Sequence, residues 1–251
     1  MPKPPMVPSR FDAVDVLRGI ALVWMTLYHF CFDLNNFGHA RFDFYRDPVW
    51  TLQRSAILSL FLLCAGLGQA LAVQQRQSWS RFWKRWVRIA ACALLVSAGS
   101  WWMFPHSYIY FGVLHGMAVM LVLARLTAGW GAWVLLPALL VLLLPFGAPA
   151  WLAASPWQDA LNAPALNWLG LISRKPVTED YVPLLPWMGV VWVGVWLGSK
   201  AAARGAGPAR SWQADGSWAG LAWLGRHSLA YYMLHQPVLI GSLWLLQQLP
   251  A

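Results

Sequence analysis

The feature that most constrains this sequence is a series of long apolar runs, each able to cross a lipid bilayer as a helix. A helix rises ~1.5 Å per residue, so ~20 mostly apolar residues cover the ~30 Å of hydrocarbon. Apolar residues make up 59% of the 251 positions and charged residues only 11%, which is far from the composition of a soluble domain. The sequence therefore predicts an all-α, polytopic transmembrane helical bundle.

Seven spans are predicted within a single transmembrane domain that covers residues 1–251. They lie at residues 13–34, 50–74, 82–104, 109–127, 130–146, 183–200 and 227–248. The stretch 147–182 contains four prolines, which argue against a further long helix there. A short re-entrant or interfacial helix around 157–171 is compatible with that stretch.

The formal charge of +9 gathers in two connections between predicted spans. One basic connection enters the third span and the other follows the sixth; they hold Arg76, Arg81, Lys84, Arg85 and Arg88, and Lys200, Arg204, Arg210 and Arg226. With Lys3 and Arg10 ahead of the first span, the positive-inside rule predicts a cytoplasmic N-terminus, and an odd span count leaves the C-terminus outside. The charge thus indicates membrane topology and contacts with membrane lipids, and no nucleic acid partner is expected.

The cysteines and the first span exclude other classes of protein. Cys31, Cys64 and Cys92 each lie alone in an apolar run without a CxxC motif, so we expect buried free thiols and no metal site. The first apolar segment carries charged residues and no small-residue cleavage pattern. It is therefore predicted to remain as a span and not to be a cleaved signal peptide.

Ionisable residues within spans are costly, so each is a candidate for function, and the first span has the most informative set. Arg18 and His29 are eleven residues apart, which puts them on one helix face about 16 Å apart along the axis. Asp33 follows His29 by four residues, and Asp15 precedes Arg18 by three. The face therefore carries Asp15, Arg18, Leu22, Met25, His29 and Asp33 from the cytoplasmic end outward.

This face offers groups suited to transfer chemistry. The guanidinium of Arg18 can donate two parallel hydrogen bonds to the phosphate oxygens of an anionic donor that enters from the cytosol. The imidazole of His29, with Asp33 fixing its tautomer, can take a proton from an attacking hydroxyl or amine. In the structural alternative, Arg18 snorkels to the interface and Asp33 only caps the span.

Further polar residues are candidates for contact with a substrate. His115 lies in the fourth predicted span, and His235 lies in the last one with Ser228 on the same face and Gln236 beside it. These histidines either contact substrate or form hydrogen bonds between helices. Arg54 opens the second span near the depth of Asp33, and an ion pair between the two is its structural alternative.

Four blocks of sequence resemble a known family. RFDAVDVLRGIALVWMTLYHFCFDLNNFG, FGVLHGMAV, DYVPLLPWMGVVWVGVWLG and WLGRHSLAYYMLHQPVLI occur in order along nearly the whole chain. They resemble the bacterial heparan-alpha-glucosaminide N-acetyltransferase catalytic-domain family, a group of transmembrane acyltransferases related to acyltransferase family 3. The spacing of Arg18 and His29 matches the Arg, ten residues, His pattern of family 3.

The resemblance implies an acyltransferase whose co-substrate is acetyl-CoA or another acyl-CoA, held from the cytosolic side. It implies that His29 is the catalytic base or acyl carrier and that Arg18 assists the donor. The heparan enzymes carry their catalytic histidine in the connection after the first span, which makes His39 the alternative base. The acceptor is expected to be a hydroxyl or amine of an envelope glycan or lipid, and the expected location is the bacterial inner membrane.

Two other classes of protein remain open from the sequence. A transporter or flippase would use Asp33, Arg54 and the histidines to line a path for its substrate. A protein that binds b-type haem would use His29, His115 or His235 as axial ligands, and would show a Soret band. The sequence does not indicate the acceptor, the acyl group, covalent or direct transfer, or the oligomeric state.

Overall fold

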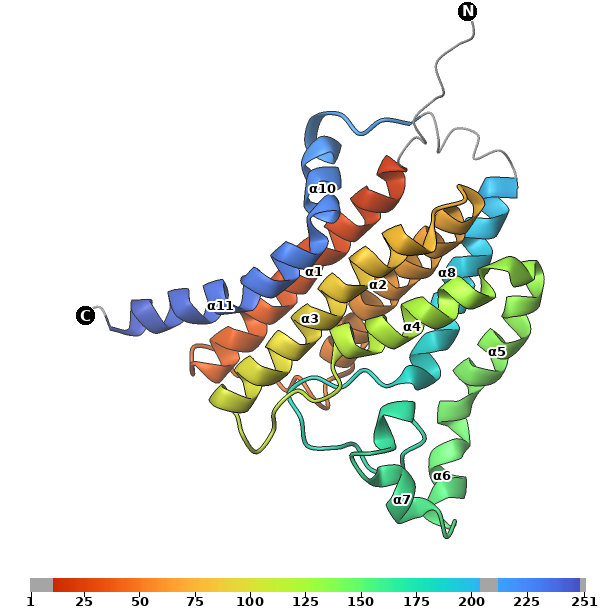
Figure 1. The fold of residues 1–251 in the computed structure, drawn as a ribbon. Helices are drawn as coiled ribbons and strands as arrows, with labels where there is room; N and C mark the ends of the chain where they lie inside the picture. The colour runs from red at the N-terminus through yellow and green to blue at the C-terminus, as the bar shows by residue number, and fades with distance from the viewer. Residues whose placement is uncertain (1–10, 204–211, 249–251) are drawn as a thin grey trace, which may run out of the picture. The chain divides into compact units, whose positions relative to one another are not determined.

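The computed structural model describes residues 11–203 and 212–248, and most of these residues fold into helices (Figure 1). Their only extended pairing is an isolated bridge between Phe111 and Tyr181. The predicted all-α class is therefore correct. Four residues on which the predicted topology partly rests lie outside the described residues; they are Lys3, Arg10, Arg204 and Arg210.

Six helical segments of the described chain are long and apolar enough to cross a membrane. They are α1 (Asp12–Asn36), α2 (Pro48–Gln74), α3 (Trp79–Met103), the stretch Val113–Phe146, α8 (Leu184–Ala203) and α11 (Ser228–Gln247). Their bounds agree with the predicted spans to within a few residues. The protein is therefore a multi-pass membrane protein.

The stretch Val113–Phe146 accounts for the difference between six segments and seven predicted spans. It consists of α4 (Val113–Thr127), the 3-10 helix η1 (Ala128–Val134), α5 (Leu135–Leu143) and the 3-10 helix η2 (Leu144–Phe146). Gly131, inside η1, has φ 61° and ψ −126°, a conformation that glycine adopts readily. Figure 1 shows the chain reversing direction at this point, so α4 and α5 form the two arms that were predicted as the fourth and fifth spans.

By its internal contacts the chain divides into two compact units, which we describe separately. Unit 1 combines Met1–Cys64 with Ala206–Ala251, and unit 2 is Ala65–Gly205. Helix α2 contributes to both. The described part of unit 1 contains α1, the first part of α2, α10 (Gly216–Arg226) and α11.

In unit 1, helix α10 packs backbone to backbone on the first half of α1. A Cβ atom at Gly19 would lie 2.1 Å from the carbonyl oxygen of Leu221, and one at Gly225 would lie 1.8 Å from that of Asp15. Only glycine allows helices to approach so closely. With eleven residues α10 is too short to span a bilayer, and it was not among the predicted helices.

The second half of α1 pairs with α11. The hydroxyls of Thr26 and Tyr231 are 2.7 Å apart, Gln236 donates to Asp33, and Gln247 donates to the carbonyl oxygen of Phe37. The numbers of the partners rise together, so the two helices run in the same direction. The first and last spans of a chain can run in the same direction only if the chain crosses the membrane an odd number of times. This parallel pair therefore supports counting the two arms of Val113–Phe146 as separate spans.

In unit 2, small residues bring α8 close to its neighbours. A Cβ at Gly66 would meet the backbone of Val191 at 2.0 Å, and one at Gly198 would meet that of Leu67 at 2.7 Å. Gly189 leaves similar room for α5. These contacts fix the helices of unit 2 through their backbones.

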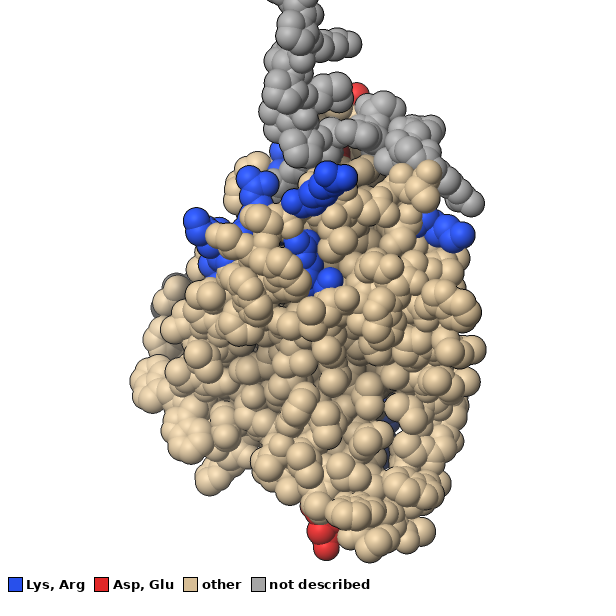
Figure 2. Space-filling view, turned by 45° about the vertical axis from the view of Figure 1, so that its right-hand side comes forward, with Lys and Arg blue, Asp and Glu red and all other residues tan. Residues whose placement is uncertain are grey.

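One end of unit 2 is basic. Gln74 at the end of α2 donates to the carbonyl oxygen of Ser199 in α8, and Arg125 at the end of α4 donates to that of Gln77. The connection from α2 to α3, the turn after α4 and the end of α8 therefore meet, and they carry the exposed residues Arg76, Arg81, Lys84, Arg85, Arg88 and Lys200. Figure 2 shows Lys and Arg side chains gathered toward one end above a long uncharged surface.

The opposite end of unit 2 is built from short elements. The stretch 147–183 contains α6 (Ala148–Ala153), α7 (Gln158–Asn162) and the 3-10 helix η3 (Asn167–Leu169), in agreement with the predicted absence of a long helix. Tyr181 donates its hydroxyl to the carbonyl oxygen of Asn167 at 2.6 Å, and burial raises the pKa of this hydroxyl, so it stays protonated.

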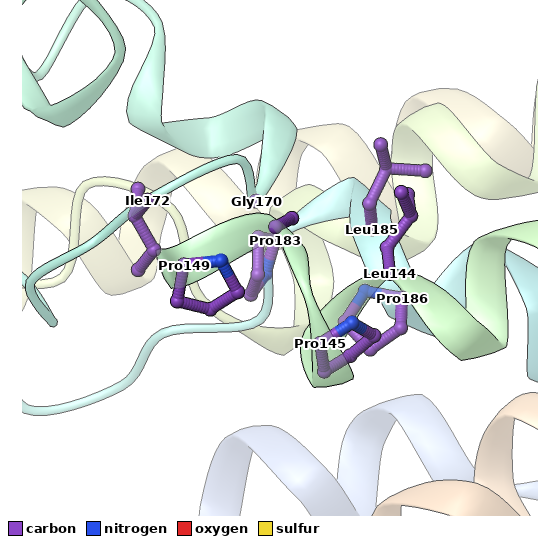
Figure 3. Close-up of a pocket in the computed structure, with 9 residues that line it drawn as sticks. Leu144, Pro145, Pro149, Gly170, Ile172, Pro183, Leu185 and Pro186 are labelled. Atoms are coloured by element: carbon purple, nitrogen blue, oxygen red, sulfur yellow. The ribbon is translucent and has the colours of Figure 1, made fainter. Parts of the chain in front are cut away.

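A hollow at this end is apolar. It is lined by Leu144, Pro145, Ala148, Pro149, Gly170, Ile172, Pro183, Leu185 and Pro186. In Figure 3, Pro145 and Pro186 lie together beside Leu144 and Leu185, and no lining side chain can titrate or act as a nucleophile. The hollow is therefore unsuited to catalysis.

Candidate functional site

Helices α1 and α11 bring four polar side chains of unit 1 together. The rings of His29 on α1 and His235 on α11 have centroids 5.2 Å apart and planes inclined by 61°. One turn further along α1, Asp33 accepts a hydrogen bond of 3.0 Å through Oδ1 from Nε2 of Gln236. We call His29, Asp33, His235 and Gln236 the α1–α11 polar cluster.

Every member of this cluster has a buried polar atom without a hydrogen-bond partner in the described chain. These atoms are Nδ1 of His29, Oδ2 of Asp33, Nε2 of His235 and Oε1 of Gln236. Buried polar atoms are nearly always paired, because leaving one unpaired costs about 1–3 kcal/mol. Four such atoms on facing turns of two helices are typical of a site that a bound molecule completes.

The tautomer of His235 follows from its hydrogen bond. Its Nδ1 lies 2.7 Å from the carbonyl oxygen of Tyr232, and because a carbonyl only accepts, Nδ1 carries the hydrogen. In the neutral ring the lone pair is then on Nε2, which is the buried atom without a partner. The ring also stacks on Tyr231, whose hydroxyl is bonded to Thr26, so its orientation is held from two sides.

The predicted pairing of His29 with Asp33 is not the one that the structure contains. Nδ1 of His29 has no partner, and Asp33 instead accepts from Gln236 while its other oxygen has none. The alternative ion pair between Asp33 and Arg54 is also absent from the described residues, and Arg54 is exposed. The ring beside His29 is that of His235.

An aromatic wall borders the cluster. Tyr28 meets His29 edge to face at 5.8 Å and Phe44 at 5.4 Å, and Phe44 lies 4.3 Å from Trp50. Phe44 belongs to the connection between α1 and α2 but is only 2% exposed. This apolar wall limits access of water to the imidazole of His29, which strengthens electrostatic interactions there.

Arg18, the predicted donor contact, lies in an ion-pair network near the start of α1. Its Nη1 bonds to Asp15 at 3.0 Å and its Nη2 donates to the carbonyl oxygen of Cys64 at 3.3 Å. Arg226 of α10 lies 3.8 Å from Asp15 and 3.6 Å from Asp12. These contacts hold Arg18 against its own unit, and its role toward a donor stays a prediction.

His115 belongs to unit 2, where both of its ring nitrogens are engaged. The backbone amide of Gly112 donates to Nδ1 at 3.3 Å, so Nε2 carries the hydrogen and faces Oγ of Ser97 at 3.0 Å. Ser97 in turn donates to the carbonyl oxygen of Ile109 at 2.7 Å. His115 therefore joins α3 to the start of α4, the second of its two predicted roles.

The other two predicted site residues, His39 and Ser228, do not belong to the α1–α11 polar cluster. His39 is exposed in the connection after α1, and its backbone amide donates to the carbonyl oxygen of Leu34. Ser228 is the first residue of α11, two turns before His235. Sequence reasoning missed the pair formed by Thr26 and Tyr231, although Thr26 lies one turn before His29 on the same helix.

Comparison with known proteins decides the family. The family model described as heparan-alpha-glucosaminide N-acetyltransferase, catalytic, matches residues 10–237. The chain belongs to this family. The match includes α1 and the part of α11 that carries His235 and Gln236, so it covers the whole α1–α11 polar cluster. No curated protein and no solved structure is significantly similar to the chain. Membership of this family implies a membrane acetyltransferase.

Proposed function

We propose that the protein transfers an acetyl or other acyl group from cytosolic acyl-CoA to a hydroxyl or amine of an envelope glycan or lipid, in the bacterial inner membrane. The observation that supports this most is the α1–α11 polar cluster: two imidazoles in contact, with unpaired buried nitrogens, within the spans of an acetyltransferase-family chain. Such nitrogens suit proton transfer or nucleophilic attack on a thioester.

His29 is the proposed reacting group, and two routes use it. In the first, an imidazole nitrogen attacks the thioester carbonyl, the carbon–sulfur bond breaks, and coenzyme A leaves as a thiol after taking a proton. The acceptor then attacks the acyl-imidazole and returns its proton to the ring. In the second, His29 removes the proton from the acceptor while the acceptor attacks the thioester directly, the carbon–sulfur bond breaks, and the leaving thiolate of coenzyme A takes that proton from the ring. The first route gives ping-pong kinetics and the second requires a ternary complex.

The neighbours of His29 have supporting roles in either route. His235, whose Nε2 keeps its lone pair, can share the proton that His29 receives. Asp33 and Gln236 each offer an unpaired oxygen that can accept a hydrogen bond from the hydroxyl or amine of the acceptor. A buried carboxylate also stabilises an imidazolium that forms beside it.

The donor is proposed to enter from the cytoplasmic end of α1. Arg18 lies eleven residues before His29 on α1, about 16 Å along the helix axis. A donor whose phosphates sit near Arg18 must therefore carry its acyl group on a long arm, as an acyl-CoA does. The acceptor then approaches from the outer side, near His29 and the connection between α1 and α2.

The test is acyl transfer by the protein in lipid nanodiscs, with labelled acetyl-CoA and an extract of envelope glycans and lipids. His29→Ala should abolish labelled product while keeping the elution profile of the wild type, and His39→Ala should retain activity. Full activity of His29→Ala would show that His29 takes no part in the reaction. If only His39→Ala lost activity, the catalytic base would be His39, in the connection after α1. Substrate movement across vesicles without acyl-CoA would favour the transporter.

A further inference from the structure

Arg125 is a buried cation whose guanidinium is only partly satisfied. It lies near the end of α4, is 7% exposed, and donates through Nη2 to the carbonyl oxygen of Gln77. Its Nη1 is buried and has no partner in the described chain. The guanidinium carbon lies 5.2 Å from the ring centroid of Trp79 and 5.8 Å from that of Phe82, so two aromatic rings contribute cation–π attraction.

No carboxylate of unit 2 is placed to neutralise this charge. The sequence has no Asp or Glu between Asp47 and Asp159, and the acidic residues of unit 2 are Asp159, Glu179 and Asp180. Asp180 accepts from the backbone amide of Val113, at the start of α4. That residue is twelve positions, or about 18 Å, from Arg125 along the helix.

The surroundings of Arg125 add further positive potential. Helix α3 begins at Trp79 behind the N-cap residue Ser78, with no acidic side chain in its first turn. The N-terminus of a helix carries a partial positive charge that favours anions. Arg81, Lys84 and Arg88 follow on the exposed surface of α3 at intervals of three and four residues. A buried guanidinium amid like charges is costly unless an anion pairs with it.

We propose that Arg125 and the first turns of α3 bind a phosphate group. A phosphate has several oxygens, so one can accept from the fork of Arg125 while the others lie in the positive potential of the first turns of α3. Trp79, whose ring lies over the guanidinium, is itself 44% exposed, so the guanidinium lies next to a residue at the surface. Two sources carry this chemistry at a basic membrane face: the phosphates of a nucleotide donor such as coenzyme A, and the headgroup of an anionic phospholipid. The proposal does not depend on which residue performs acyl transfer.

The experiment measures phosphate binding by the full chain in nanodiscs. Coenzyme A and inorganic pyrophosphate are titrated by calorimetry in discs of phosphatidylcholine, and protection against thermal unfolding is compared in discs with and without phosphatidylglycerol. The variants are Arg125→Gln and the double surface variant Arg81→Gln with Lys84→Gln. Arg174→Gln, at the opposite end of unit 2, is the matched control for loss of charge.

Loss of one charge-assisted hydrogen bond predicts roughly 10- to 100-fold weaker binding for Arg125→Gln. The surface double variant should bind several-fold more weakly, and it gives a reading even if the buried variant fails to fold. Arg174→Gln should bind as the wild type does. Effects confined to coenzyme A and pyrophosphate would assign the site to the nucleotide, and effects confined to phosphatidylglycerol would assign it to the lipid.

Three results would overturn the proposal. In the first, none of these probes binds or protects the wild type. In the second, Arg125→Gln and the double variant both bind the probes as tightly as the wild type does. In the third, Arg174→Gln loses as much affinity as Arg125→Gln does. If coenzyme A binds but neither variant changes its affinity, donor binding is located elsewhere, and the proposed acyl transfer is unaffected.

Discussion

Replacing Gly225 by alanine should destabilise the protein, because a Cβ atom there has no room. That atom would lie 1.8 Å from the carbonyl oxygen of Asp15 and 2.7 Å from its carbonyl carbon. Both obstacles are backbone atoms of α1, so no side chain can turn aside. To restore ordinary contact, α10 and α1 must separate by more than about 1 Å, which a close-packed interface resists.

Overpacking of this kind costs about 1–3 kcal/mol, and a backbone obstacle places Gly225→Ala toward the upper value. For a chain of this size the loss corresponds to a fall in unfolding temperature of roughly 2–12 °C. Tryptophan fluorescence of the protein in nanodiscs can follow unfolding on heating, since the chain has 19 tryptophans. Separation of the helices also weakens the pairs of Arg226 with Asp12 and Asp15.

The matched control lies on the same helix. Gly220 is also in α10, and a Cβ atom there meets nothing within 4 Å. Gly220→Ala should therefore leave stability unchanged or raise it by up to about 1 kcal/mol, through the higher helix propensity of alanine. The close contact between α10 and α1 is refuted if Gly225→Ala unfolds at the same temperature as the wild type. It is also refuted if the unfolding temperatures of Gly225→Ala and Gly220→Ala fall by the same amount.

Three further predictions concern the site and the topology. Gln236→Leu removes the donor to Asp33, so it should lower acyl transfer and reduce stability by about 1–3 kcal/mol; wild-type turnover would exclude this pair from the site. His115→Ala breaks the bonds to Ser97 and Gly112, so its unfolding temperature should fall while turnover per folded molecule is kept, and the reverse result would make His115 part of the reaction. Alkaline phosphatase fused after residue 251 should be active, because parallel α1 and α11 place the start of α1 and the end of α11 on opposite sides of the membrane. Activity of a cytoplasmic reporter at that position would instead contradict the odd span count.

The spans could be predicted from the sequence because the bilayer sets a single length and polarity for all of them. The bounds of α1, α3 and α8 differ from the predicted ones by only a few residues. Helix α10 could not be predicted in this way, since its eleven residues are shorter than a span. Its contact with α1 depends on Gly19 and Gly225, which look like ordinary glycines until both helices are placed.

The site was predictable within one helix but not between helices. Helical spacing put His29 and Asp33 on one face, one turn apart, and both belong to the cluster. Their true neighbours, His235 and Gln236, are more than 200 positions away, and the spacing rules that apply within a helix cannot choose between such partners. The sequence-based expectation therefore paired Asp33 with His29, whereas the nearest donor comes from α11.

The contact between α1 and α11 affects how the protein can be made. The first span and the last span each hold half of the polar cluster, and Asp33 and Gln236 are separated by 203 positions. At a synthesis rate of about 5–20 residues per second, α1 waits roughly 10–40 s before its partner emerges from the ribosome. During that time His29 and Asp33 of α1 must be sheltered by the insertion machinery or by water, and any chain that ends before α11 leaves these two side chains without their partners.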